Sequence, residues 1–233
     1  MPTDPFDVLV IGSGAAGLYA ALCLPDTYRV GLVTKDVLSQ SASDWAQGGI
    51  AAAIAPEDSP VLHKQDTLQA GAGLCEAEAV EQLVEQGADC IKSLVNFGVP
   101  FDQDQGQLAL TLEAAHSRKR VLHAADATGR AVVSTLAAAV RQRANITVFE
   151  QTLVLDLWPR GDRGQGVAVV HQGMLAWWTA GAIVLATGGG GQVFSQTTNP
   201  TASTGDGVAM AWRAGAQLRD LEFFQFHPTA LKT

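Results

Sequence analysis

Short apolar runs that end in glycine-rich turns are the main pattern along this chain. The first run, Val8–Ile11, passes directly into Gly12–Gly17 (GSGAAG), and Ala15–Leu24 then has the composition of a helix. A strand buried on both faces of a parallel sheet is almost continuously apolar, as this run is. The pattern therefore predicts a strand, a tight glycine turn and a helix at the start of an α/β domain.

The glycine turn has the G-x-G-x-x-G spacing of dinucleotide-binding sites. Gly12 permits the tight turn, Gly14 allows a pyrophosphate to approach the backbone, and Gly17 allows the helix to pack closely on the strand. The following helix directs free N–H groups and the positive end of its dipole toward phosphates. The expected ligand is FAD or NAD, and the alternative is a glycine-rich turn without a ligand.

Three later segments bear on the choice of dinucleotide. The second apolar run, Tyr28–Thr34, ends at Lys35 rather than at a carboxylate, which leaves NADP open at this position. The small, polar segment Ser41–Ile50 suits a loop lying along a bulky ring system such as a flavin. Ala182–Gly191 is a further apolar run ending in glycines, typical of a turn that closes over a flavin cofactor. Together these segments favour FAD.

The remaining hydrophobic periods predict a helical insertion followed by a β-meander. The fold class is therefore α/β, a Rossmann-like FAD-binding domain with both additions. Helices are expected over Val61–Gly71, Glu76–Phe97, Thr128–Arg143 and Thr204–Gly215, and a hairpin over Val99–Leu112. Strands are expected over Thr147–Trp158, Gly166–His171, Met174–Thr179 and Ala182–Ala186.

Composition narrows the partners and the compartment. The chain has 233 residues, 47% of them hydrophobic, and a net charge of −8, which argues against nucleic acid or an anionic membrane as a partner. It has no apolar span of about 18 residues, and Met1–Phe6 lacks the regions of a signal peptide. Its three cysteines form no C-x-x-C pair, so we expect a reduced, cytoplasmic chain without a metal site.

Several longer motifs carry a resemblance to a known family. In chain order they are Gly12–Gly17, Ala46–Ile50 (AQGGI), Leu122–Arg130 (LHAADATGR), Ala186–Gly189 (ATGG), Thr198–Pro200 (TNP), Gly205–Gly207 (GDG) and Phe226–Leu231 (FHPTAL). With them the chain resembles the fumarate reductase/succinate dehydrogenase class of flavoproteins over its whole length. The resemblance implies FAD contacts at Gly12, Ser13, Gly14, Ala15, Ala16, Gly17, Lys35, Ala42, Ser43, Gln47, Gly48, Gly49, Ala186, Thr187, Gly188 and Asp206.

The way FAD is attached differs among members of that class. Succinate dehydrogenases and membrane-linked fumarate reductases bind it covalently through a histidine in the loop before the AQGG segment. The matching residue is Ala42, which has no nucleophilic nitrogen. The resemblance therefore implies noncovalent FAD.

The segment Leu110–Ser117 (LTLEAAHS) distinguishes branches within the class. Aspartate oxidases carry a glutamate followed by Gly-Gly-His-Ser here, and the succinate enzymes lack the acid. Glu113 matches, whereas Ala114 and Ala115 replace the two glycines, which alanine can do unless φ must be positive. A carboxylate can orient the ammonium group of aspartate through a charge-assisted hydrogen bond. The alternative for Glu113 is a solvated hairpin acid next to Arg118.

The resemblance to aspartate oxidases implies FAD-dependent oxidation of L-aspartate to iminoaspartate, with oxygen or fumarate as the electron acceptor. Glu113 and His227 would be the catalytic residues, with His116 as a further substrate ligand. This reaction begins quinolinate and NAD biosynthesis, which suggests a functional link to quinolinate synthase. The alternatives are a soluble fumarate reductase and a noncatalytic FAD-binding fragment.

The same resemblance predicts the domain organisation. Residues 1–220 would be the N-terminal portion of the FAD-binding domain, and residues 221–233 the beginning of a substrate-capping domain. Family members are considerably longer, so the chain is expected to be an N-terminal part of such an enzyme and inactive alone.

Overall fold

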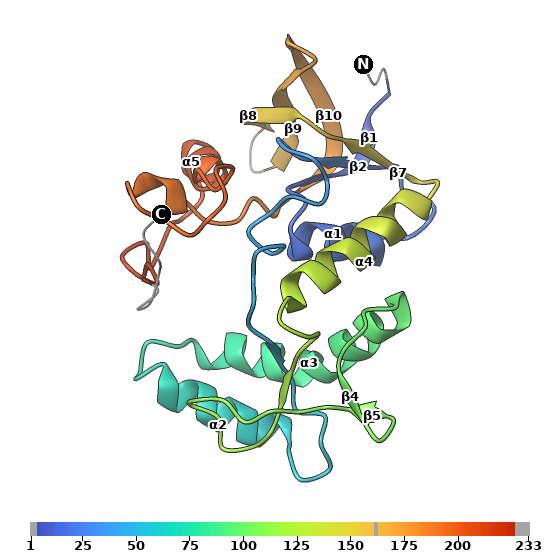
Figure 1. The fold of residues 1–233 in the computed structure, drawn as a ribbon. Coiled ribbons are helices and arrows are strands. Elements are labelled where there is room, and N and C mark those ends of the chain that lie inside the picture. The colour runs from blue at the N-terminus through green and yellow to red at the C-terminus, as the bar shows by residue number, and fades with distance from the viewer. Residues whose placement is uncertain (1–3, 161–162, 227–233) are drawn as a thin grey trace. The chain divides into compact units, whose positions relative to one another are not determined.

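The computed structural model describes residues 4–160 and 163–226 (Figure 1). The chain divides into two compact units. The first, Met1–Trp45 with Leu136–Thr233, is called the sheet unit here, and the second, Ala46–Thr135, the helical unit. Helix α4, Thr128–Gln142, runs from one unit into the other.

The sheet unit is built on a six-stranded mixed sheet with the strand order β7-β2-β1-β10-β9-β8. Strands β7, β2, β1 and the second half of β10 run parallel, and β10, β9 and β8 are antiparallel. The bounds are β1 Phe6–Ile11, β2 Val30–Val33, β7 Ile146–Phe149, β8 Thr152–Arg160, β9 Arg163–His171 and β10 Met174–Leu185. The expected α/β fold with a β-meander is confirmed.

The first strand–turn–helix unit is as the sequence predicts. The central strands β1 and β2 are buried along nearly their whole length, which explains why their sequences are continuously apolar. Helix α1, Ala15–Cys23, follows β1 and buries Leu18, Ala21 and Leu22. On the sheet, Phe6, Leu9 and Trp178 join Met210 of helix α5 (Asp206–Arg213) in one core cluster.

Two strand predictions need correction. The run Thr147–Trp158 is two strands, β7 and β8, because Gln151 adopts a positive φ of 49° between them. Conversely, the runs Met174–Thr179 and Ala182–Ala186 belong to one strand, β10. That strand pairs antiparallel with β9 as far as Thr179 and parallel with β1 from Ala180 onward. A change of partner strand, rather than a turn, accounts for the break in the apolar pattern.

The helical unit confirms the expected insertion. Ser59 caps α2 by accepting a hydrogen bond from the N–H of Leu62, and Gly98 ends α3 in the left-handed conformation. The expected hairpin is present as two short strands, β4 and β5. The bounds are β3 Ile50–Ala51, α2 Pro60–Ala70, α3 Ala77–Phe97, β4 Gln103–Asp104, β5 Gln107–Leu108 and β6 Val121–Leu122.

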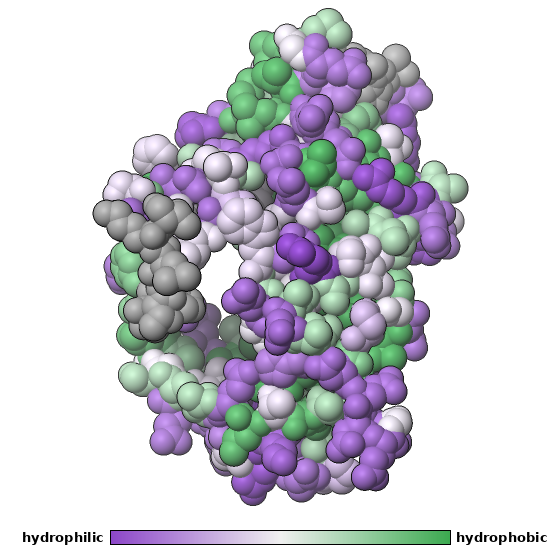
Figure 2. Space-filling model, in the orientation of Figure 1, coloured by the Kyte–Doolittle hydropathy of each residue, from purple (hydrophilic) through white to green (hydrophobic). Residues whose placement is uncertain are grey.

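Hydrophilic residues cover much of the face shown in Figure 2. Apolar side chains are nevertheless exposed on the meander strands, where Trp158 and Trp177 pack edge to face with ring centroids 5.5 Å apart. Among the described residues, no helix combines the length and the apolar character needed to cross a membrane.

Candidate functional site

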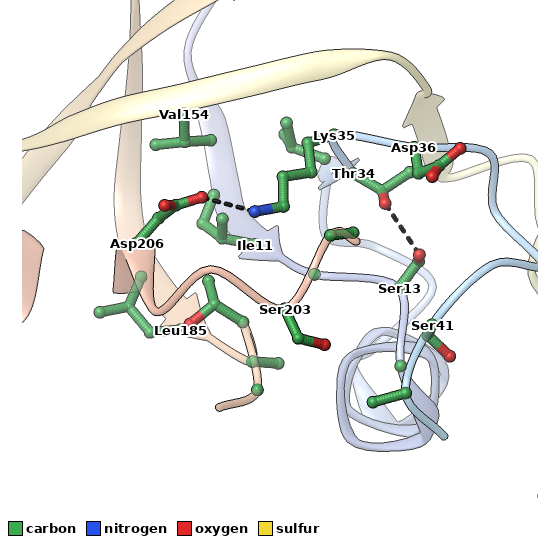
Figure 3. Close-up of a pocket in the computed structure, with 18 of the residues that line it drawn as sticks. Ile11, Ser13, Thr34, Lys35, Asp36, Ser41, Val154, Leu185, Ser203 and Asp206 are labelled. Carbon is green, nitrogen blue, oxygen red and sulfur yellow. Dashed lines mark hydrogen bonds and ion pairs between the residues drawn. The ribbon is translucent and has the colours of Figure 1, made fainter. Parts of the chain in front are cut away.

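A pocket of about 320 Å³ lies in the sheet unit, where β1, β2 and β10 end (Figure 3). Its walls are Ile11–Gly14 and Ala16, Val33–Asp36, Gln40–Ser43, Thr152–Val154, Leu185–Gly188, Pro200, Ala202, Ser203, Gly205, Asp206 and Met210. Open α/β sheets bind ligands at the carboxyl ends of their strands, and a volume of this size is typical of cofactor sites. The location and size therefore fit a nucleotide cofactor.

The glycine turn has the geometry that its sequence predicts. Gly12 has a φ of 113°, a region that L side chains rarely adopt, and its N–H donates to the carbonyl of Val33 at 2.8 Å. Gly17 lies so close to the carbonyl of Gly12 that a Cβ atom at position 17 would collide with it. Gly12 therefore shapes the pocket wall, whereas Gly17 allows α1 to pack behind it.

Serine side chains brace the beginning of α1. The Oγ of Ser43 accepts a hydrogen bond from the N–H of Ala15 at 3.1 Å, and the buried hydroxyl of Ser13 donates to Thr34 Oγ1 at 2.9 Å (Figure 3). These contacts tie the glycine turn to β2 and to the loop after it. The result is a braced glycine turn at the N-terminus of α1, a position that suits a pyrophosphate.

Lys35 forms an ion pair across the pocket. Its Nζ donates to Asp206 Oδ2 at 2.6 Å and to Thr204 Oγ1 at 2.5 Å (Figure 3). Partial burial alone would raise the pKa of Asp206, but the hydrogen bonds from Lys35 and Thr204 and the charge of Lys35 outweigh it and lower the pKa. Asp206 is therefore ionised at neutral pH and offsets the Lys35 charge. This pairing leaves less positive charge free for the additional phosphate of NADP.

Most of the expected cofactor contacts are brought together in this pocket. They are Gly12, Ser13, Gly14, Ala16, Lys35, Ala42, Ser43, Ala186, Thr187, Gly188 and Asp206. Two others lie beside it, since Ala15 contacts Ser43 and Gly17 packs behind Gly12. Gln47, Gly48 and Gly49 belong to the helical unit, so their contact with FAD stays a prediction.

Sequence reasoning missed several pocket residues. Thr152–Val154 enter the wall from the start of β8, and Met210 from α5, and no local motif marks either segment. Asp36 also lines the pocket, one position after Lys35, where we looked for a carboxylate, and three positions after the end of β2. The TNP and GDG motifs did point to the wall formed by Pro200, Gly205 and Asp206.

The candidate substrate residues Glu113 and His116 lie in the helical unit. Glu113 Oε1 is 3.0 Å from His123 Nε2, and the Glu113 side chain is 49% exposed. Arg118, the expected neighbour in the alternative interpretation, instead donates to the carbonyl of Ser117 at 2.9 Å. Ala115 has a φ of 67°, so the second alanine occupies a conformation that favours glycine.

A buried ion cluster supports this segment. Arg120 is fully buried and binds both carboxylate oxygens of Asp58 at 2.8 Å and Asp66 Oδ2 at 2.6 Å. Asp66 also accepts hydrogen bonds from the N–H and hydroxyl of Ser117, each at 2.8 Å. His116 Nδ1 lies 3.3 Å from Arg120 Nη1. The cluster thus fixes the end of the LEAAHS segment to α2.

The cluster shifts three pKa values downward. For Asp66, burial alone would raise the pKa, but hydrogen bonds from Ser117 and Arg120 lower it to about 2. Asp58 shifts the same way, where burial is outweighed by Arg120 and the N–H of Ser59. Burial and the Arg120 charge lower the pKa of His63, whose Nδ1 has no hydrogen-bond partner among the described residues. At neutral pH, the cluster therefore contains the cation of Arg120 and two aspartate anions. The neighbouring His63 is neutral.

The third candidate, His227, lies outside the described residues, so its role as a substrate ligand stays a prediction. Within the described part of the chain, no group of three or more His, Cys, Asp or Glu side chains could hold a metal ion.

The architecture and pocket define a nucleotide-binding flavoprotein domain, and comparison with known proteins identifies its family. Residues 7–233 match the family described as "FAD binding domain", and the chain belongs to that family. FAD is therefore the cofactor that the pocket is built to bind.

Among its curated relatives, the chain is similar to proteins named L-aspartate oxidase. One from Nostoc sp. is 67% identical over 228 residues, which are 97% of this chain and 39% of the relative. One from Synechocystis sp. is 61% identical over 99% of this chain and 42% of the relative. The chain thus spans well under half the length of either relative.

Solved structures give the same picture of the fold. A chain of E. coli quinol fumarate reductase superimposes with a TM-score of 0.95 at 33% identity, covering 99% of this chain and 40% of that one. A flavocytochrome c3 fumarate reductase gives a TM-score of 0.86 at 26% identity, covering 96% of this chain and 43% of that one.

Proposed function

We propose that this protein takes part in the FAD-dependent oxidation of L-aspartate to iminoaspartate. The observation that carries the proposal is its 67% identity, over 97% of the chain, to a protein named L-aspartate oxidase. The pocket supports the binding of FAD. The glycine turn, the N-terminus of α1 and the Lys35–Asp206 ion pair all lie at the carboxyl ends of the parallel strands. When bound, FAD would accept two electrons and a proton as hydride from the substrate.

The residues of the chain would bind and orient the reactants. Gly14 and Ala16, at the start of α1, and Ser43 line the pocket and would lie against the pyrophosphate. The Lys35–Asp206 pair presents a donor and an acceptor to the nucleotide. Glu113 would accept hydrogen bonds from the ammonium group of aspartate, and His116 and His227 would bind its carboxylates.

We further propose that FAD is held noncovalently. Ala42 lines the pocket at the position where covalent members of the class carry a histidine, and its methyl group has no atom that could form the bond. Acid precipitation of FAD-loaded protein should therefore release the chromophore. Yellow colour that stays with the pellet and adds the mass of FAD to a peptide would contradict this.

The remaining expectations belong to the same proposal. Oxygen or fumarate would reoxidise the flavin, and the product would enter quinolinate synthesis, consistent with a link to quinolinate synthase. The three cysteines are free, which is compatible with a cytoplasmic protein. Residues 1–220 would form the FAD-binding domain, with residues 221–233 beginning a capping domain.

The experiment that tests this function uses two proteins. The first is the 233-residue chain, titrated with FAD and assayed for peroxide release from L-aspartate. The second is a chimera in which this chain replaces the matching segment of the Nostoc relative, which supplies the rest of that protein's length. Aspartate oxidation by the chimera supports the proposal, and FAD binding without aspartate oxidation by the chimera contradicts it.

Glu113 provides the test of substrate choice. In the chimera, Glu113→Gln should raise the KM for aspartate about ten- to a hundredfold, while inhibition by succinate changes much less. Equal effects on both ligands would remove the role assigned to Glu113.

Fumarate reduction is the second candidate function, favoured by the TM-score of 0.95 to a fumarate reductase chain. Its signature would be oxidation of a reduced dye by fumarate in the chimera. Faster turnover of fumarate than of aspartate, together with indifference to Glu113→Gln, would favour this candidate.

A further inference from the structure

His123 lies within the LHAADATGR motif, and the structure places it against Glu113. It follows β6 in the helical unit, and its Nε2 lies 3.0 Å from Glu113 Oε1 and 3.1 Å from Thr111 Oγ1. An ionised carboxylate can only accept hydrogen bonds, so Nε2 must carry the hydrogen in this contact. The His123 ring therefore donates to Glu113 through Nε2.

Thr111 helps to fix that donor. Its hydroxyl donates to the carbonyl of Val121 at 3.3 Å, and its N–H donates to the same carbonyl at 2.9 Å. With its hydrogen engaged there, Thr111 Oγ1 is left to accept from His123 Nε2. The N–H of His123 is thus shared between an anchored hydroxyl and the Glu113 carboxylate.

Gly49 restricts the ring beside this nitrogen, at Cε1. A Cβ atom at position 49 would lie 2.8 Å from His123 Cε1 and 2.5 Å from the carbonyl oxygen of Leu122. Position 49 therefore has no room for a side chain. His123 is consequently confined by Thr111, Glu113 and Gly49, and its side chain is only 23% exposed.

We propose that His123 is a positioning residue for the recognition of the substrate amine by Glu113. This inference rests on the proposed function. The Glu113 side chain is 49% exposed, so without a partner it would sample several rotamers. The hydrogen bond from Nε2 holds Oε1 and leaves Oε2 available for the ammonium group, so the orientation is set before the substrate arrives.

A positioning role has a kinetic signature that a purely structural role lacks. Loss of the donor should weaken binding of an amine-bearing dicarboxylate and leave an amine-free dicarboxylate almost unaffected. A general loss of structure would weaken both. The ratio of the KM for aspartate to the inhibition constant for succinate is therefore the measured quantity.

The kinetic test compares two His123 variants of the chimera with a control variant. His123→Leu removes the donor and should raise that ratio about three- to tenfold with little change in kcat. His123→Gln retains an N–H in a similar position and should restore most of the loss. Lys119→Gln, an exposed residue of the same segment, is the matched control and should leave the ratio unchanged. An unchanged ratio in His123→Leu, or parallel loss of both ligands in both variants, would overturn the proposal.

A second measurement uses the 233-residue chain and needs no turnover. The ¹⁵N resonances of the His123 ring should show a hydrogen on Nε2, and Glu113→Ala should shift the Nε2 resonance while Lys119→Gln does not. No response to Glu113→Ala would refute the contact itself. Failure of the unmodified chimera to oxidise aspartate would instead count against the proposed function, and the NMR result would still decide whether His123 holds Glu113.

Discussion

The two units of this protein build their candidate sites in different ways. In the sheet unit, the backbone of a glycine turn shapes one wall of the pocket, beside a core cluster that is entirely apolar. In the helical unit, Glu113 contacts the side chain of His123. His116 lies beside the buried Arg120, whose charge is paired with two aspartates from separate segments. The comparison shows that the glycine turn follows from a local motif, whereas the side-chain contacts in both units join residues distant in sequence.

The contrast predicts that the helical unit is most sensitive to the loss of one charge. Arg120→Met should destabilise it by about 3–5 kcal/mol, because Asp58 and Asp66 would be left buried without their cation. The free energy of unfolding in urea, together with hydrogen exchange in α2, measures this loss. Arg118→Met, at an exposed neighbour, should change stability by less than about 0.5 kcal/mol. Similar values for the two variants would remove the distinction drawn between the units.

In the sheet unit, the corresponding weak point is a backbone conformation. Gly12→Ala should cost about 2–3 kcal/mol and abolish tight FAD binding, because the added methyl group meets the Ala186 carbonyl at an unfavourable φ. The measurements are thermal unfolding and FAD fluorescence titration. Gly189→Ala, where a Cβ atom would meet nothing within 4 Å, is the matched control. Normal FAD affinity in Gly12→Ala would show that FAD binding does not depend on the backbone conformation of Gly12.

Acid should destabilise the helical unit through Asp66. The pKa of Asp66 lies at about 2 in the folded protein against 3.8 for an unperturbed aspartate, so the ionised form favours folding above pH 4. That contribution, about 1–2 kcal/mol, should disappear as the pH falls from about 4 to 2. Urea unfolding of the helical unit at a series of pH values measures how steeply its unfolding free energy changes with pH. Asp66→Asn should flatten this dependence, and an equal slope in that variant would rule out Asp66 as the cause.

The smallest effect concerns the two alanines that replace glycines. Ala115 has a φ of 67°, so Ala115→Gly should stabilise the helical unit by about 0.5–1 kcal/mol. Ala114 has no such positive φ, and Ala114→Gly should therefore destabilise slightly by increasing the freedom of the unfolded chain. Thermal unfolding of the pair provides the comparison. The same sign for both substitutions would show that backbone strain at Ala115 is negligible.

The sequence predicted the strand–turn–helix unit, the long amphipathic α3 and the FAD family, because each depends on a local pattern of glycines or apolar positions. It did not predict that β10 is one strand, since the break at Ala180 reflects a change of partner that no local pattern records. The sequence also did not predict the cluster of Asp58, Asp66 and Arg120. Charged residues usually lie on the surface, and only the tertiary fold brings these three together.

The continuity of β10 has a consequence for how this family can vary in length. Strand β10 is the last strand of the meander, where it pairs with β9. It also leads into the Ala186–Gly188 turn of the pocket. Because side chains alternate between faces, a single-residue insertion before Ala180 would reverse every later side chain or force a bulge. We therefore expect a change of length within β10 to disturb the pocket more than a change at the Gln172–Gly173 turn between β9 and β10.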